Sequence, residues 1–260
     1  MSKIIAIGNQ KGGVGKTTTA VNIAAALVRR GKTVLGLDLD PQANMSEYLG
    51  YEYNTIYSIC DLMIAAANNN LSDEVIAQSI VHNNEGIDYI PSNINLASAD
   101  LFLSNVMCRE QVLKRILKRE IFDRYDVILI DCLPSLGILL TNALAAADGL
   151  IIPVQAQKFA LDGLVQLEQV YQMVKLNVNP DLNIEGVILT MYDNTNMAKA
   201  VEAQLETKYG NTLYVTRIHR RIEASNSTYE QKSLVSYGNS SVLGTEYINV
   251  TDEFIERSLV

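Results

Sequence analysis

Hydrophobic runs alternate along the chain with segments in which hydrophobic residues recur at helical spacing. Continuous apolar runs are typical of strands covered on both faces, as in a parallel sheet. They predict strands at residues 3–8, 33–39, 87–91, 127–130, 149–154, 184–190 and 213–216. Helical spacing predicts a helix directly after the first strand, and further helices at 96–121, 161–175, 197–209 and 241–258.

This alternation predicts an α/β fold, a doubly wound and mostly parallel sheet flanked by helices. A chain of 260 residues can bury a full core without metals or disulfides. It contains no internal repeat, no low-complexity tract and no Pro/Gly/Ser-rich linker, and residues 68–70 are expected to form a loop between helices. We therefore expect residues 1–260 to form a single domain.

A glycine-rich segment at residues 10–19 joins the first predicted strand to the helix that follows it. Glycines adopt backbone angles that let N–H groups point inward around phosphate oxygens, and the helix N-terminus adds its free donors. In such a loop Lys16 would reach the β- and γ-phosphates, and the Thr17 hydroxyl would bind Mg²⁺. The residues expected to bind the nucleotide are Gly12, Gly13, Val14, Gly15, Lys16, Thr17 and Thr18. A loop that merely caps a helix is the structural alternative.

Carboxylates follow two of the predicted strands. Asp131 stands directly after the strand at 127–130, at the edge where open α/β sheets bind ligands. We interpret it as a Walker B aspartate that holds Mg²⁺ directly or through water, with a helix cap or turn as the alternative. Asp38 and Asp40 end the strand at 33–39 and should point to the same face. Asp38 would support Mg²⁺ or the loop, and a simple turn or cap role is equally open.

The segment from Asn9 to Thr19 resembles the deviant Walker A loop of the ParA/Soj and MinD group of ATPases, because Lys11 precedes the glycine pair. The resemblance implies that Lys11 contacts ATP bound by a second subunit in a sandwich homodimer. It also implies that Asp40, in a string similar to the family's DxDPQ motif, orients the attacking water. Lys11, Lys16 and Asp40 are therefore the expected catalytic residues, with ATP and Mg²⁺ as cofactors.

The resemblance continues along most of the chain and favours the ParA/Soj branch. Matching strings stand at residues 131–137, 141–144, 153–164 and 186–193. Two positions differ from the family pattern: Leu133 replaces a proline, and Gln157-Lys158 replaces an acidic-aromatic pair. By this resemblance adenine contacts are expected at the end of the strand at 184–190, including Met191, and near His219.

The resemblance implies a DNA-partition ATPase. Its ATP-bound homodimer would bind double-stranded DNA non-specifically, and a ParB-like centromere-binding partner would stimulate hydrolysis and release. Such a protein would be cytoplasmic and associated with the nucleoid. No helix-turn-helix segment precedes the phosphate loop, so specific operator binding is not expected.

The net charge of −8 argues against a globally basic nucleic-acid-binding protein. Residues 208–232 are an exception, with a local excess of basic side chains. The resemblance implies that basic residues in this region bind DNA, and the candidates are Arg217, Arg220, Arg221 and Lys232. The alternative is that these side chains form ion pairs or line the pocket for the nucleotide base.

Two other functions compete. A MinD-like regulator of cell division or positioning, cycling on a membrane or a protein cargo, is the main alternative, but membrane cycling needs a basic amphipathic C-terminal helix and residues 249–260 are mainly acidic. A reductase like the nitrogenase iron protein would need paired cysteines around a cluster, and Cys108 and Cys132 show no such arrangement. Three cysteines without CxxC spacing favour reduced thiols in a cytoplasm. We expect neither a signal peptide nor a membrane span, and no metal apart from nucleotide-bound Mg²⁺.

Overall fold

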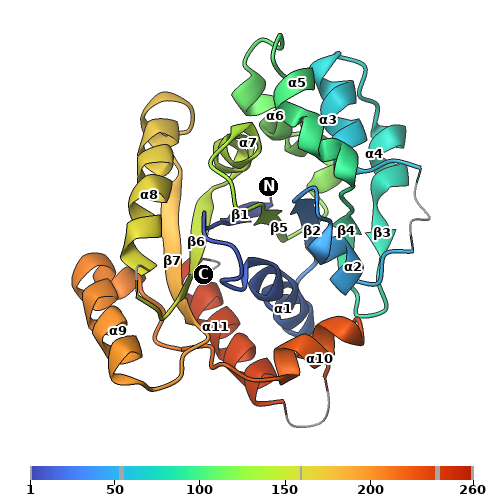
Figure 1. The fold of residues 1–260 in the computed structure, drawn as a ribbon. Coiled ribbons are helices and arrows are strands. Elements are labelled where there is room, and N and C mark those ends of the chain that lie inside the picture. The colour runs from blue at the N-terminus through green and yellow to red at the C-terminus, as the bar shows by residue number, and fades with distance from the viewer. Residues whose placement is uncertain (1, 53–55, 159, 238–240, 259–260) are drawn as a thin grey trace.

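The computed structural model describes residues 2–52, 56–158, 160–237 and 241–258. Their centre is a seven-stranded sheet with the order β3-β4-β2-β5-β1-β6-β7 (Figure 1). Neighbouring strands are parallel, except that β3 and β4 are antiparallel. The strands are β1 (Lys3–Ile7), β2 (Val34–Leu39), β3 (Val81–His82), β4 (Asp88–Ile90), β5 (Val127–Cys132), β6 (Gly149–Gln155) and β7 (Asn183–Thr190).

Helices cover both faces of the sheet, so the chain is doubly wound as predicted (Figure 1). One face carries α1 (Lys16–Arg29), α2 (Asn44–Tyr48), α10 (Glu223–Tyr229) and α11 (Val242–Ser258). The other carries α3 (Ile59–Ala67), α4 (Asp73–Ser79), α5 (Ala99–Phe102), α6 (Val112–Leu117), α7 (Ile138–Ala146), α8 (Ala160–Asn177) and α9 (Asn196–Tyr209).

Strand alternation divides the hydrophobic core between these two faces. On β1, Ile5 and Ile7 pack toward α1 and α11, whereas Ala6 belongs to the cluster under α3, α6 and α7. Residues of β1, β2, β5 and β6 are mostly buried. Each of these strands lies between two other strands, and helices cover both faces of the sheet. This explains why continuous hydrophobic runs located these four strands.

The predicted helix at 96–121 is wrong. The segment instead forms the 3₁₀ turn η1 (Ile94–Ser98), α5, the turn η2 (Arg109–Gln111), α6 and the turn η3 (Glu120–Phe122). Cys108 interrupts it with a left-handed backbone, at φ 52°. The buried Asn142 side chain of α7 then accepts a hydrogen bond from Leu113 N (3.0 Å) and donates one to Arg109 O (2.9 Å). These contacts start a new helix at a point that the hydrophobic spacing does not reveal.

Residues 213–216 do not form the predicted strand. Leu213 makes one isolated bridge to Val187 of β7, and residues 215–216 then form a bend in place of a strand. Glu253 of α11 accepts hydrogen bonds from the backbone N–H groups of Val215 and Thr216, both at 2.8 Å. Because a side chain takes these donors, the segment lies along β7 without continuing the sheet.

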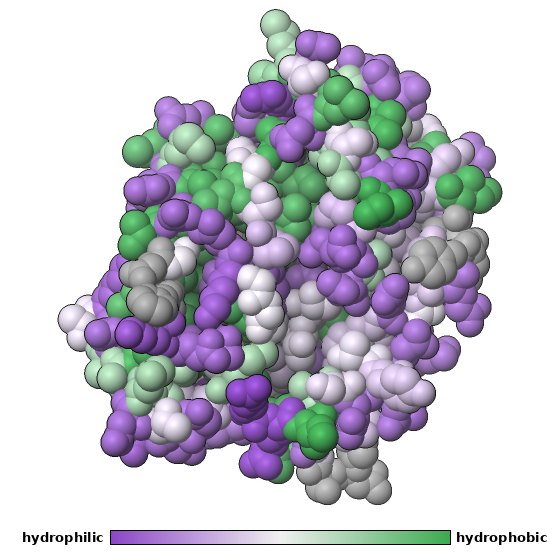
Figure 2. Space-filling model, viewed as in Figure 1, coloured by the Kyte–Doolittle hydropathy of each residue, from purple (hydrophilic) through white to green (hydrophobic). Residues whose placement is uncertain are grey.

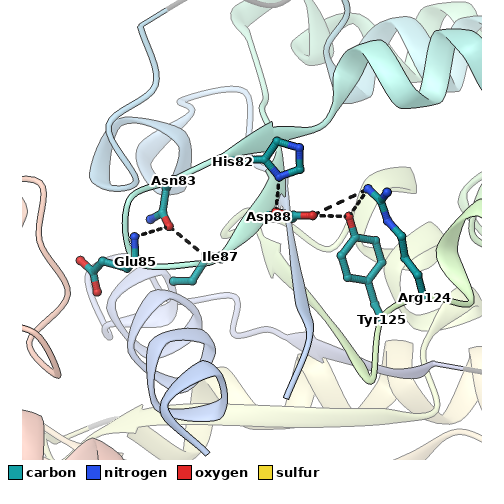
Figure 3. Close-up of polar contacts among 7 residues, drawn as sticks. All are labelled: His82, Asn83, Glu85, Ile87, Asp88, Arg124 and Tyr125. Atoms are coloured by element: carbon teal, nitrogen blue, oxygen red, sulfur yellow. Dashed lines mark hydrogen bonds and ion pairs between the residues drawn. The ribbon is translucent and has the colours of Figure 1, made fainter. Parts of the chain in front are cut away.

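The short antiparallel strand β3 was not predicted. It forms a hairpin with β4 through a turn in which Asn83 Oδ1 accepts hydrogen bonds from the N–H groups of Glu85 and Ile87 (Figure 3). Asp88 connects this hairpin to the segment that precedes β5 by accepting a hydrogen bond from Tyr125 Oη at 2.7 Å (Figure 3). Among the described residues, no helix is long and apolar enough to cross a membrane.

Candidate functional site

The glycine loop lies between β1 and α1 at the carboxyl edge of the sheet. Gly13 and Gly15 have φ values of 71° and 87°, a left-handed region that favours glycine. Asn9 fixes the start of the loop, because its side chain accepts a hydrogen bond from Lys11 N (2.9 Å) and donates one to Pro153 O of β6 (2.7 Å). No side chain in the described part of the chain caps the start of α1, so its first N–H groups remain available to a ligand.

Lys16 and Thr17 place a cation and a hydroxyl at the base of this loop. Lys16 is buried, and its Nζ donates a hydrogen bond to Lys11 O at 3.1 Å. Burial lowers the pKa of its ammonium group, although the nearby Asp131 opposes that shift. The Thr17 hydroxyl donates to Asp131 Oδ2 at 2.7 Å, so the loop and β5 meet at one pair of oxygens.

Asp131 has a carboxylate oxygen without a protein partner. It is buried, and Oδ1 accepts no hydrogen bond from any described residue. Burial, together with the neighbouring carboxyl group of Asp38, raises its pKa well above the ordinary range. A divalent cation would supply the missing positive charge, so the residues present fit Mg²⁺. No group of three or more His, Cys, Asp or Glu side chains among the described residues could hold a metal alone, so phosphate oxygens and water would complete the coordination.

Asp38 supports the loop that follows β2. Its Oδ2 accepts hydrogen bonds from Ser46 N (2.8 Å) and Ser46 Oγ (2.6 Å), and Oδ1 accepts one from Asp40 N (3.1 Å). Burial raises the pKa of Asp38 to about 6, although these donors oppose the shift. Of the roles open from the sequence, these contacts describe support of the loop, and contact with Mg²⁺ stays a prediction.

Asp40 lines a cavity of about 460 Å³ above the glycine loop. Its Oδ1 accepts a hydrogen bond from Gln42 N at 2.9 Å. The cavity brings together eight residues predicted from the sequence: Gly12, Gly13, Gly15, Lys16, Thr17, Thr18, Asp40 and Met191. Val14 is instead buried beneath the loop, where its carbonyl accepts a hydrogen bond from Thr190 Oγ1 at 2.8 Å.

A smaller cavity of about 220 Å³ adjoins the first, and Gly15, Thr18 and Met191 line both. Met191 and His219, both expected near the base, contribute to its wall. The remaining wall is Thr190, Ile218, Arg220, Arg221, Ala224, Ser225, Leu234, Leu243 and Tyr247. Most of these side chains come from the last fifth of the chain and carry no recognisable motif, so sequence reasoning missed Tyr247 and all of α10.

The four basic candidates have different surroundings. Arg220 and Arg221 are exposed and line the smaller cavity, near α10. The face of the molecule drawn in Figure 2 mixes hydrophilic and hydrophobic residues. Arg217 forms an ion pair with Glu202 and lies against the ring of Tyr192. Lys232 is within 3.6 Å of Glu230. Ion pairing therefore describes two of the four, while Arg220 and Arg221 remain open to a ligand.

Lys11 and the cysteines complete the set of sequence candidates. Lys11 Nζ donates a hydrogen bond to Gln157 Oε1 at 3.2 Å, within the same chain. The cysteines are all free: Cys60 and Cys132 are buried, and Cys108 is exposed. Burial also raises the pKa of the Cys132 thiol far above its ordinary value, which leaves it protonated.

Comparison with known proteins agrees with this geometry. A family model described as an AAA domain matches residues 2–184. The sporulation initiation inhibitor protein Soj of Bacillus subtilis is 41% identical over 254 residues, which cover 97% of this chain and 98% of that protein. The chromosome-partitioning ATPase Soj of Treponema pallidum is 40% identical, with 99% of this chain and 98% of that protein covered.

Solved structures share the fold over their whole length. Cobyrinic acid a,c-diamide synthase from Mycobacterium smegmatis, with bound ADP and magnesium, is 31% identical with a TM-score of 0.81, covering 100% of this chain and 97% of its own. A plasmid partition protein from Borrelia burgdorferi is 26% identical with a TM-score of 0.74, and 98% of each chain is covered.

The parallel sheet, the glycine loop and the carboxylate at the end of β5 define a P-loop ATPase. With relatives at 40% identity over nearly their full length, the chain belongs to the ParA/Soj family. The predicted family, the doubly wound fold and the ATPase activity are therefore confirmed.

Proposed function

We propose that this chain is a DNA-partition ATPase. Its ATP-bound homodimer binds double-stranded DNA without sequence preference, and a ParB-like partner stimulates hydrolysis that releases the DNA. In a cell it would act in the cytoplasm, associated with the nucleoid. The observation that carries the ATPase part is the hydrogen bond from the half-buried Thr17 to the buried Asp131, whose Oδ1 has no partner among the described residues. The partition part rests on relatives whose names describe chromosome partitioning.

The residues of the loop account for ATP binding and for the charge on its phosphates. The free N–H groups of the loop and of α1 donate to phosphate oxygens, and Lys16 places a desolvated cation beside them. Thr17 and Asp131 would hold Mg²⁺, which neutralises charge between the β- and γ-phosphates when bound. The base would enter the smaller cavity beside Met191 and Tyr247.

Asp40 accounts for the hydrolytic step. It lines the same cavity as Lys16 and Thr17, in the part of the wall formed by the segment after β2. In this position it would accept a hydrogen bond from the water that attacks the γ-phosphorus as the bond to ADP breaks. Lys11 would add positive charge to the nucleotide of a second subunit once it leaves Gln157.

The DNA part makes a direct prediction about Arg220 and Arg221. The double variant Arg220→Ala/Arg221→Ala should bind a fluorescent 40-base-pair duplex at least about tenfold more weakly in the ATP state. With fewer phosphates neutralised, fewer counterions are released from the DNA on binding, and this release favours binding. The dependence of binding on salt should also become shallower. Fluorescence anisotropy with ATP, ADP or no nucleotide, at several salt concentrations, measures both effects.

The matched control is Arg115→Ala/Lys118→Ala, which removes the same charge from two exposed positions on the other face of the sheet, one in α6 and one directly after it. It should leave DNA binding nearly unchanged. Because Arg220 and Arg221 also line the smaller cavity, ATP affinity is measured in parallel. Equal DNA affinity for wild type and double variant, with ATP bound in both, would refute this surface. No DNA binding in any state would refute the partition function and favour a membrane or protein cargo.

A further inference from the structure

Helix α10 forms part of the wall of both cavities of the nucleotide site. Ala224 and Ser225, near its start, line the smaller cavity. Thr228 and Tyr229, near its end, line the larger one, where Asp40 lies. The helix is therefore in a position to contact both the base and the region around the phosphates.

Between these two pairs, Ser227 points inward and is fully buried. Its hydroxyl lies 2.7 Å from the hydroxyl of Tyr48, the last residue of α2. The Tyr48 side chain is itself 2% exposed, and burial raises its pKa, so the phenol stays neutral. A short hydrogen bond in such dry surroundings connects α10 to α2 directly.

Helix α2 begins only four residues after Asp40, and the residue that precedes the helix has a strained backbone. Ala43, which precedes it, has φ 56° and ψ 30°, a left-handed backbone that costs a non-glycine residue about 1–2 kcal/mol. Such a conformation persists only where the surrounding structure enforces it. Within α2, Ser46 at its middle is held by Asp38, and Tyr48 at its end is held by Ser227.

Asn22 and Glu85 hold the residues that follow α10, which limits how far the end of α10 can move. The buried Asn22 of α1 accepts a hydrogen bond from Leu234 N at 2.6 Å. Glu85, on the β3–β4 hairpin drawn in Figure 3, accepts hydrogen bonds from Ser233 N at 2.7 Å and Ser236 Oγ at 2.8 Å. A change at the base side of α10 is therefore passed to Tyr48 rather than absorbed by a loose segment.

We propose that Tyr48 and Ser227 are positioning residues, whose hydrogen bond couples occupation of the base cavity to the placement of Asp40. A base in the smaller cavity packs against the start of α10, Ser227 holds Tyr48, and Tyr48 keeps α2 and the strained Ala43 in the arrangement that aims Asp40. The inference rests on the proposed role of Asp40 in orienting water.

The test compares steady-state ATP hydrolysis at saturating ATP and Mg²⁺, without DNA, for wild type, Tyr48→Phe, Ser227→Ala and the double variant. Each single change should lower kcat about fivefold, as expected for loss of one neutral hydrogen bond. Tyr48 Oη also accepts a long hydrogen bond from Asn22 Nδ2 at 3.5 Å, which only Tyr48→Phe removes. The double variant should therefore lose no more than Tyr48→Phe alone, because Ser227→Ala removes a bond that Tyr48→Phe has already removed. The dissociation constant for ATP should stay within twofold.

Two further variants set the scale. Tyr171→Phe removes another buried tyrosine hydroxyl, which donates to Leu182 O away from the nucleotide cavities, and should leave kcat unchanged. Asp40→Ala should lower kcat by about 100-fold while ATP still binds. In the Tyr48→Phe background, Ala43→Gly should recover part of the lost rate, because glycine adopts the left-handed backbone without strain.

A lower melting temperature with unchanged kcat would overturn the coupling and leave Tyr48 and Ser227 as structural residues only. Multiplicative losses in the double variant would also overturn it. If Asp40→Ala hydrolyses ATP at the wild-type rate, the role proposed for Asp40 fails and the coupling fails with it. Because the assay contains no DNA, a failure of DNA binding is a separate result.

Discussion

Asp38 and Asp131 stand opposite each other on the neighbouring strands β2 and β5, and both carboxyl groups are buried. Burial disfavours the charged form of each. The carboxyl group of Asp38 further disfavours ionisation of Asp131, and that of Asp40 disfavours ionisation of Asp38. The pKa of Asp38 is raised to about 6, and that of Asp131 is raised as well. Without bound metal the site therefore retains protons that an unfolded chain would release.

This has a consequence for stability that can be measured. Since the pKa of Asp38 rises from an ordinary value near 4 to about 6 on folding, the free energy of unfolding should fall as pH rises through that window. The contribution of Asp38 is at most about 3 kcal/mol. Urea denaturation with EDTA and without nucleotide, at pH values between 4 and 7, should show a steeper fall for wild type than for Asp38→Asn. Equal slopes would contradict the raised pKa.

The sequence located the residues of the phosphate site because each is adjacent to a strand end. The glycine loop follows β1, Asp40 follows β2, and Asp131 is near the end of β5, and parallel strands bring their carboxyl ends to one edge. Tyr48, Ser227 and Tyr247 could not be found in this way. They reach the site by tertiary packing from separate helices, and no spacing in the chain records that Tyr48 and Ser227 meet.

At the scale of elements, hydrophobic runs identified the buried strands, whereas hydrogen bonds from Asn142 interrupt the long helix that was predicted at 96–121. β5 and β6 are uninterrupted apolar runs because both of their faces are covered. The segment at 96–121 has enough hydrophobic residues for one helix, but Asn142 from α7 captures its backbone groups. Sequence periodicity describes which residues are buried, and it does not reveal a hydrogen bond supplied from another element.

Two glycines, Gly186 in β7 and Gly163 in α8, should respond in opposite ways to substitution by alanine. At Gly186 a Cβ atom would lie 1.8 Å from Cε2 of the buried Tyr214, so Gly186→Ala should lower the free energy of unfolding by about 3 kcal/mol. At Gly163 in α8 a Cβ atom would meet nothing within 4 Å, so Gly163→Ala should raise it by about 0.5 kcal/mol. Chemical denaturation measures both. A neutral Gly186→Ala would mean that the Tyr214 ring moves freely.

At the scale of the whole molecule, Lys11 is the residue proposed to reach a second subunit. Among the described residues, Gln157 Oε1, at the surface, is the one hydrogen-bond acceptor of Lys11 Nζ. A single exposed hydrogen bond of this kind contributes little to stability, so the ammonium group can leave Gln157 at small cost. The proposed homodimer requires this movement.

Lys11→Ala should therefore prevent dimer formation while ATP binding persists. Light scattering with a non-hydrolysable ATP analogue should give twice the monomer mass for wild type and the monomer mass for Lys11→Ala. Lys199→Ala, which removes a positive charge from an exposed position on α9, is the matched control and should dimerise normally. A Lys11→Ala dimer that forms at the same protein concentration would exclude a contact made by Lys11 across the interface.

The way in which β7 is covered has a consequence for folding of the nascent chain. The outer edge of β7 is occupied by residues 213–219, whose Tyr214 and Ile218 N–H groups donate to Val187 and Leu189, and Glu253 of α11 holds this cover in place. Unpaired strand edges recruit other strands and promote aggregation. Because the cover and α11 are synthesised after β7, a ribosome-bound intermediate presents that edge until α11 docks, and this interval is when a chaperone would protect the chain most effectively.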